Sequence, residues 1–230
     1  RPTREDRRLD REILSETFTI GLPALGTTFV SCFGYIAFAR MVSGMGTTIF
    51  AAHSIAITAE QIVYIPGYGL RVATSTLVGN ALGEKDIRKL KATERVSILI
   101  TLLIMVVNGI GLYLFAYPFM RLFTNSVNAA RIGSEMLRLV SFSEPFFGLM
   151  IVLEGISYGM GRTKHVFACE AVSMWGIRIF GTFLCVNVFG LGLKAVWLCM
   201  IADNICKAIL LYIFRPKHVE ENADDRGELR

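Results

Sequence analysis

The stretch that decides the fold is VSILITLLIMVVNGIGLYLFAYPF, residues 96–119, in which no side chain carries a charge. A helix needs about 20 largely apolar residues to cross the roughly 30 Å hydrocarbon core of a bilayer, and this stretch is long enough. In lipid the backbone must satisfy its own hydrogen bonds, which a segment of this length does as a helix. We therefore expect a transmembrane helix here.

Similar apolar segments lie on both sides of this stretch, and the charged residues collect between them. The chain is 53% hydrophobic and only 19% charged, whereas a soluble domain carries charge on about a quarter of its residues. These features predict an all-α integral membrane protein, a bundle of six transmembrane helices without a soluble domain. The expected spans are Phe18–Met41, Phe50–Ala81, Val96–Phe119, Glu135–Met160, Val166–Val188 and Ala195–Phe214.

The second segment is longer than one crossing requires, and a kink is expected in it near Pro66.

Lysine and arginine are distributed very unequally between the two sets of loops. Sixteen of them lie in the two terminal stretches and the second-to-third and fourth-to-fifth loops, against three in the other loops. Basic residues favour the cytoplasmic side, so both termini are expected there, at the inner face of the plasma membrane. We interpret residues 1–17 as a cytoplasmic loop, 18–214 as the transmembrane unit and 215–230 as a cytoplasmic tail without fixed structure.

The net charge of +5 is explained by these loops, so a nucleic-acid partner is not expected. The five cysteines lie in apolar blocks without Cys-x-x-Cys spacing and are interpreted as buried small hydrophobic residues. Residues 155–159 fit Gly-x-Ser-x-Gly, but they lie within an expected membrane helix instead of a strand-to-helix turn. We therefore expect no catalytic residues, no metal site and no cofactor.

The informative residues are ionisable groups inside the spans, because each costs several kcal/mol if it faces lipid. Glu60 lies ten residues into the second segment, about 15 Å from its outer end and thus near the membrane midplane. An isolated carboxylate at this depth suits the binding of a proton or another cation. The alternative is a structural partner for a basic group on a neighbouring helix.

Glu144 and Glu154 flank the middle of the fourth segment and share a broad face of that helix. Glu144 precedes Pro145, where a freed backbone carbonyl could add a further oxygen ligand. Both carboxylates are candidates for cation or substrate binding, with a structural role the stronger interpretation for Glu154, which lies deeper toward the cytoplasm.

Three further charges lie in the last two segments. Asp203 and Lys207 are four residues apart, so that they could neutralise each other on one helix. Arg178 lies at a similar depth in the fifth segment. These three residues are predicted to form a structural charge cluster between the last two helices, with direct substrate contact as the alternative.

Five short motifs occur in an order that resembles the multidrug and toxic compound extrusion (MATE) family. Together they cover nearly the whole chain from Gly21 to Phe214. They are Ala51-Ala-His-Ser-Ile55, the run from Pro66 to Asp86, Arg121-Leu-Phe-Thr-Asn125, Gly159-Met-Gly-Arg-Thr-Lys164 and Gly192-Leu-Lys-Ala-Val-Trp197.

This resemblance implies one lobe, the C-terminal one, of a transporter with twelve spans in two pseudo-symmetric lobes, the N-terminal lobe being a missing partner. It implies export of small organic, often cationic, compounds by alternating access, driven by Na⁺ or H⁺. Many relatives carry an acidic residue in the first helix of this lobe where Ser31 stands here, and Tyr158 and Arg162 also depart from the family pattern. Glu60 and Glu144 therefore become the better candidates for the coupling group.

Two other functions fit six spans. A flippase for lipid-linked oligosaccharides, from the same superfamily, would need a strongly basic cavity for its pyrophosphate cargo. A membrane scaffold that transports nothing would not need to retain carboxylates at mid-depth.

Overall fold

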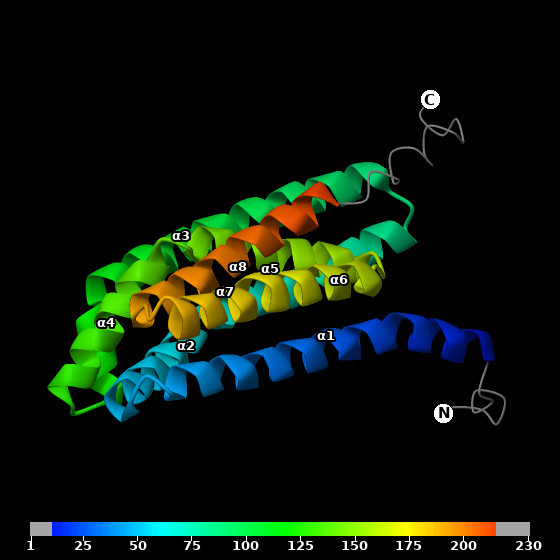
Figure 1. Ribbon diagram of the computed structural model, residues 1–230. Helices are drawn as coiled ribbons and strands as arrows, with labels where there is room; N and C mark the ends of the chain where they lie inside the picture. The colour runs from blue at the N-terminus through cyan, green and yellow to red at the C-terminus, as the bar shows by residue number, and fades with distance from the viewer. Residues whose placement is uncertain (1–10, 215–230) are drawn as a thin grey trace, which may run out of the picture.

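A computed structural model describes residues 11–214, so that residues 1–10 and 215–230, with the predicted start of the loop and the predicted tail, lie outside the described residues. The described part is a bundle of helices without a strand (Figure 1). Its elements are α1 (Arg11–Ser43), α2 (Thr47–Gly83), α3 (Ile87–Phe123), α4 (Val127–Ser141), α5 (Glu144–Gly159), α6 (Thr163–Ser173), the π-helical η2 (Met174–Ile179), α7 (Phe180–Phe183), the π-helical η3 (Leu184–Val188) and α8 (Leu193–Ile213).

The helices confirm the predicted class of fold. Five helical stretches are long and apolar enough to cross a membrane, and the pair α4 and α5 supplies a sixth if it is one bent span. The fifth predicted span corresponds to the unbroken helical run from α6 to η3, in which two turns have π-helical geometry.

The fourth predicted span, Glu135–Met160, is wrong as one straight helix. α4 begins at Val127 and ends at Ser141, and α5 starts at Glu144 at an angle of 61° to it. The Ser143 amide and hydroxyl both donate to the Val140 carbonyl oxygen, at 2.7 and 2.8 Å, which closes the end of α4. Pro145 then lacks the N–H that a continuing helix would need. The break places Glu144 at the start of a helix instead of inside one.

One predicted boundary and one predicted kink also change. α1 begins no later than Arg11, so that residues 11–17, predicted as loop, are helical, although the membrane-length part starts at Thr17, close to the prediction. The kink expected at Pro66 does not interrupt α2, which continues as one helix. Asn108 of α3 donates to the Val63 carbonyl oxygen at 3.0 Å, which supplies a partner in the turn that the proline weakens.

Small residues on α5 let it approach α2 closely. A Cβ added to Gly155 would lie 2.7 Å from the Arg71 carbonyl oxygen, and one added to Gly159 would lie 2.5 Å from that of Ser75. Glycines four residues apart are typical of closely packed membrane helices. This contact fixes the register of the two helices and brings Arg71 beside Glu154.

α1 lies along one edge of the bundle (Figure 1) and packs mainly against α6. Two of its glycines receive side chains from α6 and η2, because a Cβ on Gly26 would meet the Phe167 ring at 3.0 Å and one on Gly34 would meet Met174 at 2.6 Å. Ser31 of the same helix also faces α6, because its hydroxyl donates to Glu170.

Candidate functional site

A cavity of about 730 Å³ lies between the helices, lined by residues of α1, α2, α5, α6, η2 and α8. Its lining combines aromatic and hydroxyl side chains with equal numbers of acidic and basic groups. The acidic side chains are Glu60, Glu154 and Glu170, and the basic side chains are Arg71, Arg178 and Lys207.

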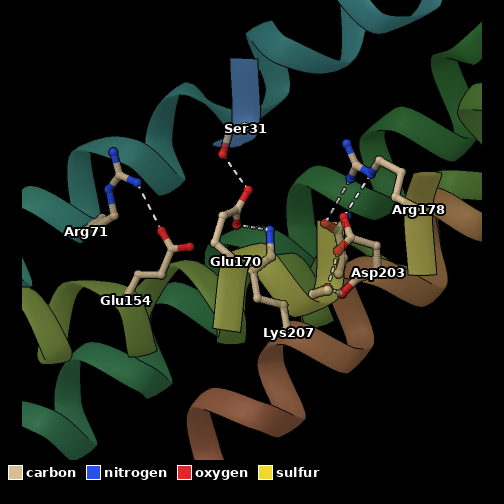
Figure 2. Close-up of polar contacts among 9 residues, drawn as sticks. Ser31, Arg71, Glu154, Glu170, Arg178, Asp203 and Lys207 are labelled. Carbon is tan, nitrogen blue, oxygen red and sulfur yellow. Dashed lines mark hydrogen bonds and ion pairs between the residues drawn. The ribbon is translucent and has the colours of Figure 1, made fainter. Parts of the chain in front are cut away.

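Each basic residue of the cavity forms an ion pair with a carboxylate on another helix (Figure 2). The joined atoms are Arg71 Nη1 and Glu154 Oε2 at 3.0 Å, Arg178 Nε and Asp203 Oδ2 at 2.8 Å, and Lys207 Nζ and Glu170 Oε2 at 2.5 Å. Ser173 also donates to the Asp203 carboxylate. The three cations of the cavity are thus neutralised by protein.

The predicted pairing of Asp203 with Lys207 on one helix is wrong. α8 runs back along the helix that precedes it, so that Asp203 meets Arg178, and Lys207, one turn further on, meets the earlier residue Glu170. Arg178, Asp203 and Lys207 thus lie between the last two spans together with a fourth charged residue, Glu170.

Glu170 is the site residue that the sequence reasoning missed. It lies inside the apolar segment Val166–Val188, so the rule that picked out Arg178 would also have found it. Its Oε1 accepts a hydrogen bond from the Ser31 hydroxyl of α1 at 2.5 Å while its Oε2 pairs with Lys207 (Figure 2). Glu170 thereby connects α1, α6 and α8.

Glu60 differs from the other carboxylates that line the cavity. It is 2% exposed, and Tyr64, one turn later on α2, donates its hydroxyl to Glu60 Oε1 at 2.5 Å. Within residues 11–214 no lysine, arginine or histidine forms an ion pair with it. The Tyr64 hydroxyl is bonded to Oε1 of Glu60, so that Oε2 remains for another partner.

The two predicted carboxylates of the fourth span lie in different environments. Glu154 lines the cavity and pairs with Arg71. Glu144 is outside the cavity lining and has no exposed surface, and neither of its carboxylate oxygens has a hydrogen-bond partner. Its Cβ lies 3.2 Å from where a Cβ on Gly109 of α3 would stand. No group of three or more potential metal ligands occurs in the described part of the chain.

Membrane-length helices that enclose a cavity with a buried charge network are the architecture of a membrane transporter, in which intramembrane ionisable residues mark substrate and ion pathways. Residues 23–184 match the MatE family model, and the chain belongs to the MATE family of transporters.

The chain is 30% identical over 201 residues to a probable multidrug resistance protein NorM from Thermotoga maritima, an alignment that covers 86% of this chain and 43% of that protein. Solved structures share its fold. A MOP superfamily transporter from Pyrococcus furiosus superimposes with a TM-score of 0.85 at 21% identity over 95% of this chain and 49% of that one. The Vibrio cholerae MATE transporter VcmN in its bent form gives 0.85 at 16% identity over 96% and 50%. The chain thus spans about half the length of the relatives it matches.

Proposed function

We propose that this chain is one lobe of a cation-coupled antiporter that exports small organic compounds, mainly cationic ones such as drugs and toxins, by alternating access. Na⁺ or H⁺ is the coupling ion, and a facing six-helix lobe completes the transporter. The relatives named multidrug resistance protein support export of multiple drugs. The observation that supports a cationic substrate is that no basic residue in the described part of the chain forms an ion pair with Glu60.

Glu60 supplies a carboxylate that no lysine, arginine or histidine among the described residues holds in an ion pair. Arg71, Arg178 and Lys207 are each held by a carboxylate, so the cavity has no free cation to attract an anionic substrate. A coupling ion and a cationic substrate can both satisfy Glu60, and their competition for one carboxylate is the basis of exchange. Tyr64, Tyr68 and Phe147 line the same cavity and offer aromatic surface to a cation.

The two alternatives fit this cavity less well. A flippase for a pyrophosphate-linked lipid needs excess positive charge, which the three neutralised bases do not provide. A scaffold has no use for a carboxylate that lacks a protein cation, since such a group costs stability in a membrane protein. The Pyrococcus furiosus transporter, which shares this fold, has a binding pocket of reverse polarity. The charge of the pocket can therefore differ between transporters of the same fold.

We further propose that both termini and the basic segment Lys85–Arg95 face the cytoplasm, at the plasma membrane. Most of this segment forms the first turns of α3, where Asp86 accepts from the Lys89 amide at 2.9 Å. A cysteine introduced at the exposed Lys85, in a background without the native cysteines, should react with an impermeant maleimide in inside-out vesicles only. Labelling in intact cells would reverse the orientation.

Transport is tested in proteoliposomes that contain either the 230-residue chain alone or the transporter in which a facing lobe completes it. A fluorescent lipophilic cation is loaded, and a pH gradient or a Na⁺ gradient is imposed separately. We expect gradient-driven flux from the complete transporter with one of the two gradients and none from the chain alone, because the cavity of one lobe needs a facing wall. Flux of an anionic dye in place of the cation would overturn the proposed substrate class.

A further inference from the structure

Two cysteines come together at one end of the bundle. Cys185 belongs to η3 and Cys199 to α8, and their Sγ atoms are 3.7 Å apart. All five cysteines lie in the described residues. Among them, no other pair has an Sγ–Sγ hydrogen-bond contact. The interpretation of all five as buried residues holds for Cys169 alone, because Cys32 is exposed and Cys185, Cys199 and Cys206 are partly exposed.

The backbone around the pair holds the two sulfur atoms in place. The short connection from η3 to α8 folds back on Cys185, whose carbonyl oxygen accepts from the Leu191 amide at 2.7 Å. Gly190 turns the chain with a φ of 59°, a conformation that glycine adopts without strain. On the other side, Cys199 Sγ lies 3.3 Å from where a Cβ on Gly181 would stand. A larger residue at position 181 would therefore be in tight contact with Cys199.

The distance suits formation of a disulfide. The Sγ atoms must approach from 3.7 Å to about 2.05 Å, which rotation of the two side chains can provide. The pair lies at the end of the lobe where α8 begins, away from the end where α8 finishes at Ile213 (Figure 1). Both cysteines lie within membrane-length helical stretches, Thr163–Val188 and Leu193–Ile213, toward the ends that meet in this connection. In the proposed orientation these ends are on the outer side of the membrane, where disulfides form and persist.

We propose that Cys185 and Cys199 are a redox-active pair that is bridged by thiol–disulfide exchange with a small or protein disulfide on the outer side of the membrane. One thiolate attacks a sulfur of the disulfide R–S–S–R, forms a mixed disulfide and releases R–S⁻. The second thiolate attacks the cysteine sulfur of this mixed disulfide and releases the other R–S⁻. Two protein thiols are oxidised, R–S–S–R is reduced to two thiols, and the protons pass from the cysteines to these products.

The bridge would join η3 to α8 covalently. Deeper in the bundle the same two spans are already joined by the pair of Arg178 and Asp203. A second fixed point near the outer surface would prevent the two spans from sliding or separating there. The proposal does not depend on the transport function, since it concerns only the chemistry of this contact.

The test uses the full chain, purified in detergent and treated with one equivalent of dithiodipyridine. A paired dithiol releases two thiopyridone molecules per reagent molecule and leaves a protein without a pyridyl group, whereas an isolated cysteine keeps one as an adduct. We expect the accessible thiols after denaturation to fall from five to three, peptide mapping to join Cys185 to Cys199, and a reductant to restore all five.

Matched variants identify the pair. Cys185→Ser and Cys199→Ser should each abolish the bridge and give pyridyl adducts, whereas Cys169→Ser and Cys206→Ser should leave it intact. A charged, impermeant aromatic disulfide should bridge the pair in intact cells and not in sealed inside-out vesicles. A bridge that persists in Cys185→Ser, pyridyl adducts without a bridge in the unaltered chain, or bridging from the inside only would each overturn the proposal.

Discussion

Replacement of Glu60 by glutamine in the complete transporter is expected to reduce coupled efflux of an organic cation to the background rate, while the amount of protein stays near that of the wild type. Glutamine keeps the shape of the side chain and an oxygen that can accept from Tyr64, so that the packing of α2 is retained. It removes the negative charge for which the coupling ion and the substrate compete. The measurement is efflux per unit of transporter in membranes, with protein level determined in parallel.

Two variants separate the charge of Glu60 from its surroundings. Tyr64→Phe removes the hydroxyl that donates to Glu60 and retains the carboxylate, so we expect efflux to weaken without disappearing. Glu144→Gln removes a carboxylate outside the cavity lining and should retain more efflux than Glu60→Gln. If Glu60→Gln exports at the wild-type rate, Glu60 is a structural residue and the proposed exchange site is elsewhere.

The spans could be predicted because they depend on local composition. The run from Val96 to Phe119 is uncharged throughout and lies wholly inside α3. The break between α4 and α5 could not be predicted from the same rule, because Pro145 by itself is also compatible with a kinked helix that continues. The two bonds from Ser143 to Val140 decide the outcome, and they are a property of the folded turn.

The members of the site could mostly be predicted, because a charge inside an apolar span is visible in the sequence. Their partners could not, because pairing depends on how helices far apart in the chain are aligned. Arg71 meets Glu154 because Gly155 lets the backbone of α5 approach that of α2. Lys207 had a candidate partner one turn away in Asp203, and only the antiparallel packing of α8 gives it Glu170 instead.

The second large effect is expected on folding, from Asp203→Asn. Asp203 has no exposed surface and pairs with Arg178, which is 5% exposed. The Arg178 guanidinium also lies over the rings of Tyr35 and Phe38 of α1, at 5.5 and 5.8 Å from their centroids, so that it is held between α1 and α8. Removal of one partner of a buried pair costs about 3–5 kcal/mol, because the other charge remains buried.

We therefore expect Asp203→Asn to lower the yield of folded protein sharply and to reduce its thermal stability, as measured by size-exclusion chromatography and thermal unfolding in detergent. The matched control is Glu84→Gln, which removes an ion pair with Lys89 that is about half exposed on both sides, and a pair of this kind contributes about 0–1 kcal/mol. Removal of both buried charges, in Asp203→Asn with Arg178→Met, should recover much of the lost yield, since no charge is then left unpaired. If Asp203→Asn folds as well as Glu84→Gln, the buried pair does not hold the last two spans together. The charge of Asp203 would then act on the substrate, and the same variant would show this as reduced efflux.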